Sequence, residues 1–157
     1  MKMTIFKKIL FAIFVLNLLQ SCGYKPLLTG QNQNFSITEV NISGDKKLSL
    51  TLGNYFTEVE DAKNSLILEI KASKQKVVSN KNSLGATSEY TVTINFDVNV
   101  ISEQSKELVF SETFSQNNSF KASKVHLDTL NRENKIVDNS VKNIADQITK
   151  KLNIIFN

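Results

Sequence analysis

The sequence predicts an α+β fold: a two-layer sandwich in which a four-stranded, mostly antiparallel sheet packs against two helices. Two patterns support this prediction. Residues 89–101 alternate between apolar and polar side chains, which is typical of a strand with one buried face. From Asn131 onward, apolar residues recur three or four positions apart, which is typical of an amphipathic helix. Each pattern leaves one apolar surface, and the two surfaces can bury each other.

Residues 1–21 have the features of an export signal. Three lysines precede an apolar run over residues 9–19, which is shorter than the roughly 20 residues of a membrane-spanning helix. The next residues, Leu19-Gln20-Ser21-Cys22, resemble a lipobox, in which the cysteine thiol accepts lipid. The alternative, an ordinary thiol at Cys22, leaves the chain's only cysteine unpaired in an oxidising compartment. We therefore predict a lipoprotein signal peptide and lipidation of Cys22.

The residue after the cysteine is Gly23, and known lipoprotein sorting rules then favour the outer membrane over the inner one. Removal of the signal leaves 136 residues, enough for one domain. The three signal lysines leave as well, so the net charge falls from +4 to +1. Basic charge is therefore no argument for nucleic-acid binding, and no nucleic-acid partner is predicted.

After a lipidated tether over residues 22–34, the domain is expected to span residues 35–157. Residues 35–42 alternate, with Phe35 and Ile37 on one side and Val40 and Ile42 on the other, which indicates a first strand with a bulge or an edge position. Residues 43–64 allow two interpretations. The first is a helix capped by Ser43 or Asp45, with apolar residues at Leu48, Leu52, Tyr55 and Val59. The second is a strand through Leu48, Leu50 and Leu52.

Residues 65–78 form the next predicted strand, and its polar second half suggests that it projects from the sheet. Residues 80–86 are a turn-rich loop, and residues 89–101 and 107–120 are expected to form a hairpin. In the second strand of that hairpin, Leu108, Phe110 and Phe114 match the apolar face of the first. The C-terminal helix is expected to be capped by Asn131 or Asn134, with Glu133 near its N-terminal dipole end. Its predicted apolar stripe consists of Val137, Val141, Ile144, Ile148, Leu152 and Ile155.

Residues for catalysis or metal binding are scarce. His126 is the only histidine, and no second histidine or free cysteine completes a zinc site or a nucleophilic triad. The carboxylates at Glu58, Glu60 and Asp61 are best explained as a solvated helix end. We therefore predict no enzyme activity, no cofactor and no metal. A group of lysines allows two interpretations: they are simply solvated, or they contact an anionic ligand. The group consists of Lys71, Lys74, Lys76, Lys81, Lys121 and Lys124.

The run Cys22-Gly23-Tyr24-Lys25-Pro26-Leu27 resembles the start of the LptE lipopolysaccharide-assembly lipoproteins. The alternating strand at Glu89-Tyr90 and the helix over residues 143–148 add to the resemblance. It implies a plug inside the lumen of an LptD-like outer-membrane β-barrel, facing the periplasm. It also implies lipopolysaccharide binding through basic side chains, for which position and charge favour Lys81, Lys121 and Lys124.

Two other functions are compatible with the same residues. The first is a secretion-system pilot or a general structural outer-membrane lipoprotein, which a concave groove for a peptide would favour. A long, exposed, polar extension of the sheet would favour the barrel plug instead. The second, a lipid-anchored hydrolase, requires a polar pocket around His126.

Overall fold

The computed structural model describes residues 33–60 and 62–156. The predicted signal peptide, the lipid acceptor Cys22 and nearly all of the predicted tether lie outside these ranges. The described elements are β1 (Phe35–Gly44), α2 (Lys46–Gly53), β2 (Asn64–Lys81), β3 (Thr87–Ser102), β4 (Leu108–Lys121) and α3 (His126–Phe156).

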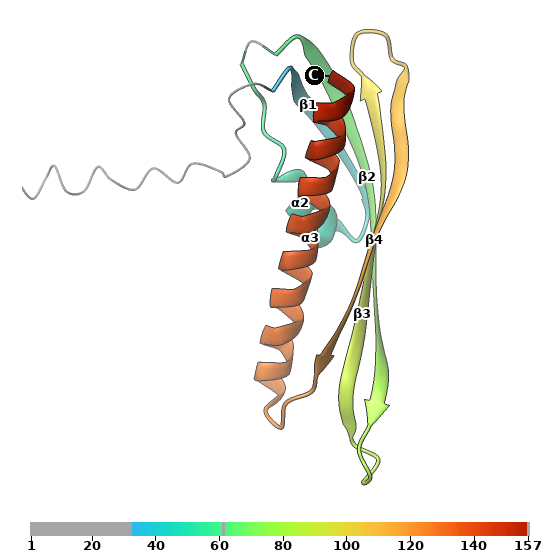
Figure 1. The fold of residues 1–157 in the computed structure, drawn as a ribbon, viewed down its shortest axis with the longest axis vertical. Coiled ribbons are helices and arrows are strands. Elements are labelled where there is room, and N and C mark those ends of the chain that lie inside the picture. The colour runs from blue at the N-terminus through green and yellow to red at the C-terminus, as the bar shows by residue number, and fades with distance from the viewer. Residues whose placement is uncertain (1–32, 61, 157) are drawn as a thin grey trace, which may run out of the picture.

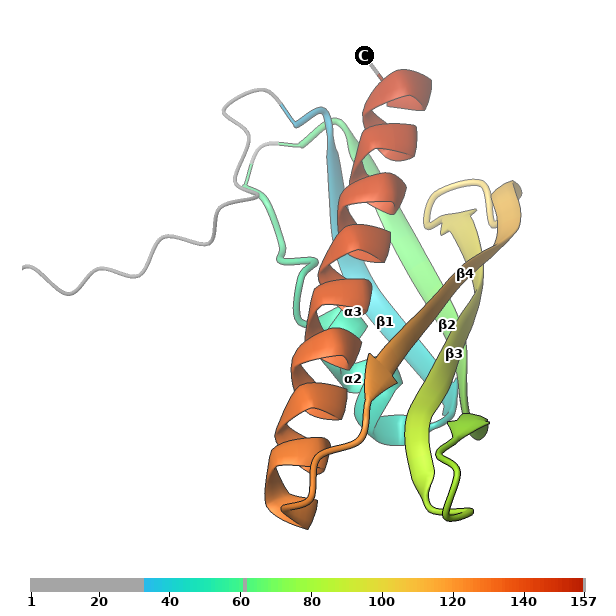
Figure 2. The same cartoon turned by 60° about the horizontal axis from the view of Figure 1, so that its bottom comes forward.

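The four strands form one sheet in the order β1-β2-β3-β4. The pair β1 and β2 is parallel, and the other two pairs are antiparallel. Both helices lie against the same face of the sheet (Figures 1 and 2). The predicted α+β fold, with a mostly antiparallel sheet packed against two helices, is confirmed.

One hydrophobic core lies between the sheet and the helices. The alternation in β3 places its apolar side chains toward the helices, as predicted, and those from Val92 to Val100 are almost completely buried. The apolar stripe of α3 covers them. The largest fully buried side chains of the core are Phe35, Phe96, Leu52, Leu66, Leu68, Ile70, Ile94, Ile144, Ile148 and Leu152.

Residues 46–53 form a helix, so the alternative strand interpretation of this segment is wrong. Asp45 caps the helix, because its side-chain Oδ1 accepts a hydrogen bond of 3.1 Å from the backbone N–H of Leu48. Leu48 and Leu52 are buried in the core. The helix ends at Gly53, so Tyr55 and Val59 lie beyond it rather than on its apolar face.

Strand β1 has both features predicted for it, an edge position and a bulge. The register shifts between Ile37 and Glu39, which leaves Thr38 as an extra residue. After an extra residue, each following side chain points to the face opposite to the one that simple alternation gives. Val40 and Ile42 therefore face the helices together with Ile37, whereas simple alternation places them on the opposite side.

A second register shift corrects the prediction for Leu108. Val100 of β3 pairs with Phe110, but the next residue, Ile101, pairs with Leu108. The skipped residue turns Leu108 to the face away from the helices, where it is 59% exposed. Phe110 and Phe114 remain on the helix-facing side, as predicted.

Helix α3 begins at His126, five residues before Asn131, so neither Asn131 nor Asn134 caps it. Its 31 residues give it a length of about 46 Å. In the predicted apolar stripe, Val137 is partly buried and the members from Val141 to Leu152 are buried, but Ile155 is 43% exposed.

Strands β2 and β3 project past the core as a hairpin. Every residue of β2 from Ser73 to Lys81 is exposed, as the polar second half of the strand predicted. The turn is closed by Asn82, whose Oδ1 accepts hydrogen bonds from the N–H groups of Leu84 and Ala86. We call the end of the molecule that carries this turn and the start of α3 the hairpin end; it lies at the bottom of Figure 1. The C-terminal end of α3 lies at the opposite end.

Candidate functional site

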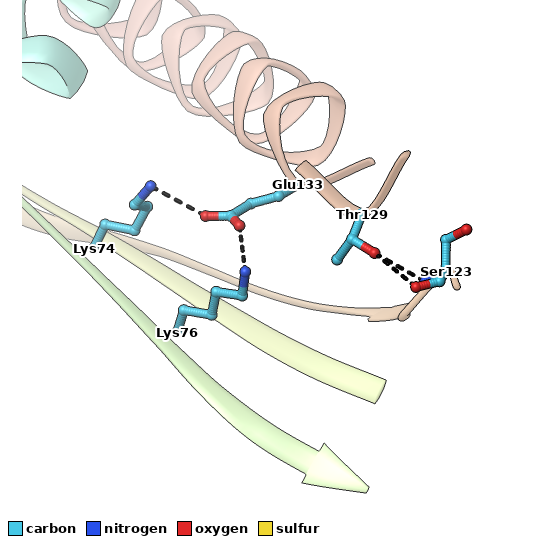
Figure 3. Close-up of polar contacts among 5 residues, drawn as sticks. All are labelled: Lys74, Lys76, Ser123, Thr129 and Glu133. Carbon is cyan, nitrogen blue, oxygen red and sulfur yellow. Dashed lines mark hydrogen bonds and ion pairs between the residues drawn. The ribbon is translucent and has the colours of Figure 1, made fainter. Parts of the chain in front are cut away.

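A polar cluster fastens the first half of α3 to the sheet near the hairpin end. Glu133 of α3 is 7% exposed, and its two carboxylate oxygens lie 3.2 Å from Nζ of Lys74 and 2.6 Å from Nζ of Lys76. Figure 3 shows the carboxylate between the two ammonium groups of β2. The two lysines are two residues apart on one strand, so both side chains point to the same face.

The protonation of Glu133 depends on this pairing. Burial disfavours the charged carboxylate and by itself raises the pKa of Glu133. The hydrogen bonds and positive charges of Lys76 and Lys74 outweigh burial, so the pKa of Glu133 lies below its ordinary value. Glu133 is therefore ionised at neutral pH.

Lys76 is held from a second side by aromatic rings. Its Nζ lies 4.3 Å from the ring centroid of Tyr90 on β3 and 5.7 Å from that of Phe120 on β4. The two rings contact each other with a centroid separation of 5.7 Å. A cation beside a ring face is attracted electrostatically. The cluster therefore joins three strands to α3.

Further polar contacts extend along the first half of α3. Thr129 is 5% exposed, and its Oγ1 accepts a hydrogen bond of 2.9 Å from the backbone N–H of Ser123 (Figure 3). Ser140 accepts a hydrogen bond of 3.0 Å from the side-chain amide of Asn118 on β4. Within the part of the chain that the structure describes, every buried side-chain nitrogen or oxygen has a hydrogen-bond partner.

The two halves of α3 thus contact the sheet differently. Its buried side chains as far as residue 140 are polar, whereas those from Val141 to Leu152 are apolar. Lys151 adds one ion pair at the apolar end, to Glu112 of β4, and its Nζ lies 5.2 Å from the ring of Phe110.

The structure changes the interpretation of two lysines that were candidates for an anionic ligand. Lys74 and Lys76 are paired with Glu133, which the sequence placed near the N-terminus of the helix. Because α3 starts at His126, Glu133 lies about two turns into the helix and faces the sheet. Glu133 precedes Val137 by four positions and Val141 by eight, so it lies on the same side of the helix as these apolar residues. This spacing is the sequence signal that could have identified its burial. Lys71 lies on the other face of the sheet, opposite Asp97 in the register of β2 and β3.

The three favoured lysines lie at the hairpin end and are exposed. Lys81 is the last residue of β2, Lys121 is the last residue of β4, and Lys124 lies between β4 and α3. Glu89 of β3 pairs with Lys121 and also with Asn80, next to Lys81. The three lysines therefore share one end of the molecule, but no direct contact joins them.

Exposed apolar side chains accompany these lysines at the hairpin end. Leu84 in the turn of the hairpin is 90% exposed, and Val77 and Val78 are about half exposed. On the other side, Val125 and Leu127 at the start of α3 are 56% and 63% exposed. The hairpin end thus presents cations and apolar groups together, a combination suited to an anionic amphiphile.

The residues considered for catalysis are dispersed. His126 is exposed at the first position of α3, and Glu58 and Glu60 are separated from it in the segment between α2 and β2. Asp61 lies outside the described residues. Within those residues no group of three or more histidine, cysteine or acidic side chains is arranged to hold a metal ion.

The face of the sheet away from the helices is polar. Hydroxyl groups of β4 donate to β3 across the strand pair, from Ser111 to Asn99, from Thr113 to Asp97 and from Ser115 to Asn95, at 2.7 to 2.8 Å. Beside them lies a hollow of about 330 Å³ over β1, β2 and β3. Cross-strand pairs of this kind stabilise the sheet and leave the face wetted by water.

No helix within residues 33–60 and 62–156 is long and apolar enough to cross a membrane.

Comparisons with known proteins identify the fold. No protein-family model matches the chain, and no curated protein sequence matches it. The crystal structure of rare lipoprotein B from Shewanella oneidensis is similar, with a TM-score of 0.53 at 15% identity, over 73% of this chain and 92% of the other.

Two further solved structures are similar. A minor lipoprotein from Acinetobacter baumannii gives a TM-score of 0.52 at 12% identity, over 77% of this chain and 91% of the other. Lipoprotein B from Nitrosomonas europaea gives 0.52 at 14% identity, over 81% and 88%. At such low identity the likeness is one of fold, and the chain therefore shares its fold with solved bacterial lipoproteins.

Proposed function

We propose that the chain is an outer-membrane lipoprotein that acts as plug and assembly factor of an LptD-like β-barrel and assists the insertion of lipopolysaccharide into the outer leaflet. The observation that carries the proposal is the hairpin end, where exposed lysines and exposed apolar side chains lie together. Lipopolysaccharide is an anionic amphiphile, and its phosphates and acyl chains match these two kinds of group.

The shared fold supports the proposal. Solved structures with this fold include proteins described as rare lipoprotein B and minor lipoprotein. The lipobox ending at Cys22 and the start Cys22-Gly23-Tyr24-Lys25-Pro26-Leu27 indicate lipidation and resemble the LptE lipoproteins. Lipid at Cys22 would anchor the domain to the outer membrane, facing the periplasm and the barrel lumen.

The projecting hairpin supports a plug rather than a secretion-system pilot. The second half of β2, from Ser73 to Lys81, is exposed and mostly polar, as expected of a segment that reaches into a barrel lumen, whose interior is polar. The lumen is also compatible with the hydroxyl and amide groups on the uncovered face of the sheet. The proposed role is not catalytic: recognition and positioning of lipid require neither a nucleophile nor a metal.

Purification of the tagged chain from detergent-solubilised outer membranes tests the proposal. We expect a lipopolysaccharide-transport barrel to be recovered with it at comparable amounts. Recovery without such a barrel would contradict the plug role, and recovery of a secretion complex instead would support the pilot or structural lipoprotein. The matched control is the same purification with Cys22→Ser, which retains the domain but removes the lipid acceptor.

A further inference from the structure

The start of α3, residues 126–135, turns polar side chains toward the sheet and apolar ones away from it. Of these residues only Thr129 and Glu133 are buried. Leu127 and Leu130 lie on the outer side, where they are 63% and 38% exposed. The apolar burial that holds the second half of α3 on the sheet is therefore missing at its start.

Glu133 is the side chain that ties this segment to the strands. Its carboxylate lies between Nζ of Lys74 and Nζ of Lys76, as Figure 3 shows. Thr129 bonds instead to Ser123, in the connection between β4 and α3, so this contact can move with the helix. In the part of the chain that the structure describes, no other side chain of residues 126–135 forms a hydrogen bond or ion pair with a strand. The segment can therefore separate from the sheet when this one carboxylate leaves the two lysines.

The two lysines border apolar side chains on the same face of the sheet. In the register of β2 and β3, Lys74 lies opposite Ile94 and Lys76 lies opposite Val92. Ile94 and Val92 are each 1% exposed. Two residues beyond Lys76, on the same face, Val78 is 47% exposed. We call these five residues the covered strip: it runs from an open end at Val78 to apolar side chains that are out of reach of water.

The ammonium group of Lys76 keeps a second support when the carboxylate leaves. Its Nζ lies 4.3 Å from the ring centroid of Tyr90, and a cation beside a ring face is attracted electrostatically. Lys76 would therefore stay on the covered strip, ready to bind another anion.

We propose that the covered strip is a binding site for an anionic amphiphile with a phosphate group and an alkyl chain, and that Glu133 blocks this site until the ligand displaces it. Carboxylate and phosphate both accept charge-assisted hydrogen bonds from ammonium groups, so one anion replaces the other at Lys74 and Lys76. The alkyl chain then covers the apolar side chains that the start of α3 uncovers. Residues 126–135 act as an autoinhibitory segment.

This inference rests on the proposed function and adds a form of regulation to it. Lipopolysaccharide and anionic phospholipids both carry phosphate and acyl chains, so either can supply this chemistry. Because Glu133 belongs to the same chain, it competes with any free ligand at a high effective concentration. The apparent affinity for the ligand is reduced by the fraction of molecules in which the segment is closed.

Removal of the blocking carboxylate tests the proposal. The full-length exported protein is held in neutral maltoside micelles and titrated calorimetrically with dodecyl phosphate. We expect Glu133→Gln to bind this probe about tenfold more tightly than the natural chain, because the open fraction rises. The matched control is Glu112→Gln, which removes the same charge from the ion pair with Lys151 and is expected to leave the affinity unchanged. No gain in Glu133→Gln, or an equal gain in both variants, would overturn the proposal.

The two lysines are tested in the same background. Adding Lys74→Gln and Lys76→Gln to Glu133→Gln is expected to abolish the gain in affinity. Adding Lys46→Gln and Lys47→Gln, at exposed positions of α2, removes the same charge and is expected to preserve the gain. A gain that survives without Lys74 and Lys76 would contradict the assigned site.

Hydrogen exchange tests the natural chain and does not depend on how well any variant folds. Saturating dodecyl phosphate is expected to speed amide exchange in residues 126–135 and to leave residues 144–152 unchanged. Unchanged exchange in residues 126–135 would contradict displacement of the segment. Competition then identifies the source of the ligand: displacement of the probe by lipopolysaccharide or by phosphatidylglycerol supports the site, and displacement by neither would overturn it.

The outcomes separate this inference from the plug role. A barrel that is recovered with the chain, together with no gain in Glu133→Gln, would overturn the blocked site alone. A gain in Glu133→Gln without any recovered barrel would overturn the plug role alone.

Discussion

Glu133 of α3 and Lys76 of β2, 57 positions apart in the sequence, lie 2.6 Å apart at their charged groups. With Lys74 they form the main polar link between the long helix and the projecting part of the sheet. We expect Glu133→Ala to lower the free energy of unfolding by about 1–3 kcal/mol, because it leaves two partly buried ammonium groups without their carboxylate. Urea unfolding followed by circular dichroism measures the change.

The control for this substitution is Glu107→Ala, in the exposed turn between β3 and β4. It is expected to change the free energy of unfolding by less than about 0.5 kcal/mol. Similar losses in both variants would show that the Glu133 pairing contributes little.

The lowered pKa of Glu133 predicts a pH dependence. The folded state binds the proton more weakly than the unfolded state, so the stabilisation is complete above the unfolded carboxyl pKa of about 4.3. It is lost as the pH falls through the lower pKa of the folded state. We therefore expect the difference in unfolding free energy between the natural chain and Glu133→Gln to be largest at neutral pH and to shrink under acid. A difference independent of pH would contradict the assignment.

Gly44 links β1 to α2 in a conformation that a side chain cannot share. Its φ is +72°, and a Cβ atom there would lie 2.2 Å from the backbone oxygen of Ala72. That oxygen also accepts the N–H of Asp45 at 2.8 Å. We expect Gly44→Ala to lower the melting temperature markedly. Gly85→Ala has a similar φ of +78° but no atom within 4 Å of the added Cβ, so it is expected to cost only about 1–2 kcal/mol. An equal loss of stability in Gly44→Ala and Gly85→Ala would show that the contact with the backbone oxygen of Ala72 relaxes easily.

The lysines at the hairpin end predict a change in ligand binding without a change in folding. Replacing Lys81, Lys121 and Lys124 together by Gln is expected to weaken binding of purified lipopolysaccharide about tenfold, since each exposed ion pair contributes about 0.2–1 kcal/mol. The effect is expected to diminish at high salt. Binding is measured by fluorescence titration with labelled lipopolysaccharide.

The control triple variant changes exposed lysines outside the hairpin end, namely Lys46, Lys47 and Lys150. It removes the same net charge. An equal loss of affinity in both triple variants would show that net charge, rather than the hairpin end, determines binding.

His126 provides a test of the non-catalytic role. We expect His126→Ala to support lipopolysaccharide export at the level of the natural chain in a complementation assay, because the side chain is exposed at the helix start. Loss of export with normal protein level and normal melting temperature would favour the hydrolase hypothesis.

Much of the fold could be predicted because its periodicities are local. Strict alternation in β3 places its apolar side chains on one face whatever the rest of the chain does. The three-and-four spacing in residues 137–152 likewise determines the buried side of α3. The cap at Asp45 is a contact over three residues, and the sequence contained it as one of two candidates.

The errors arose where an inserted residue or a distant partner decides the outcome. Leu108 matches the apolar face by counting, but the register shift after Val100 turns it outward. Residues at the start of α3 carry no apolar stripe. The predicted start of the helix, capped by Asn131 or Asn134, is therefore later than the observed start at His126.

By itself, the sequence determined the strands, the C-terminal helix, the buried faces of β3 and of residues 137–152, and the candidate lipid acceptor, because these depend on neighbours within one or two turns. Only the tertiary structure decided that β1 runs parallel to β2, that Glu133 is buried between Lys74 and Lys76, and that Lys81, Lys121 and Lys124 share one end with exposed apolar residues. These relationships join positions far apart in the chain, and their energies depend on packing and desolvation that no local pattern records.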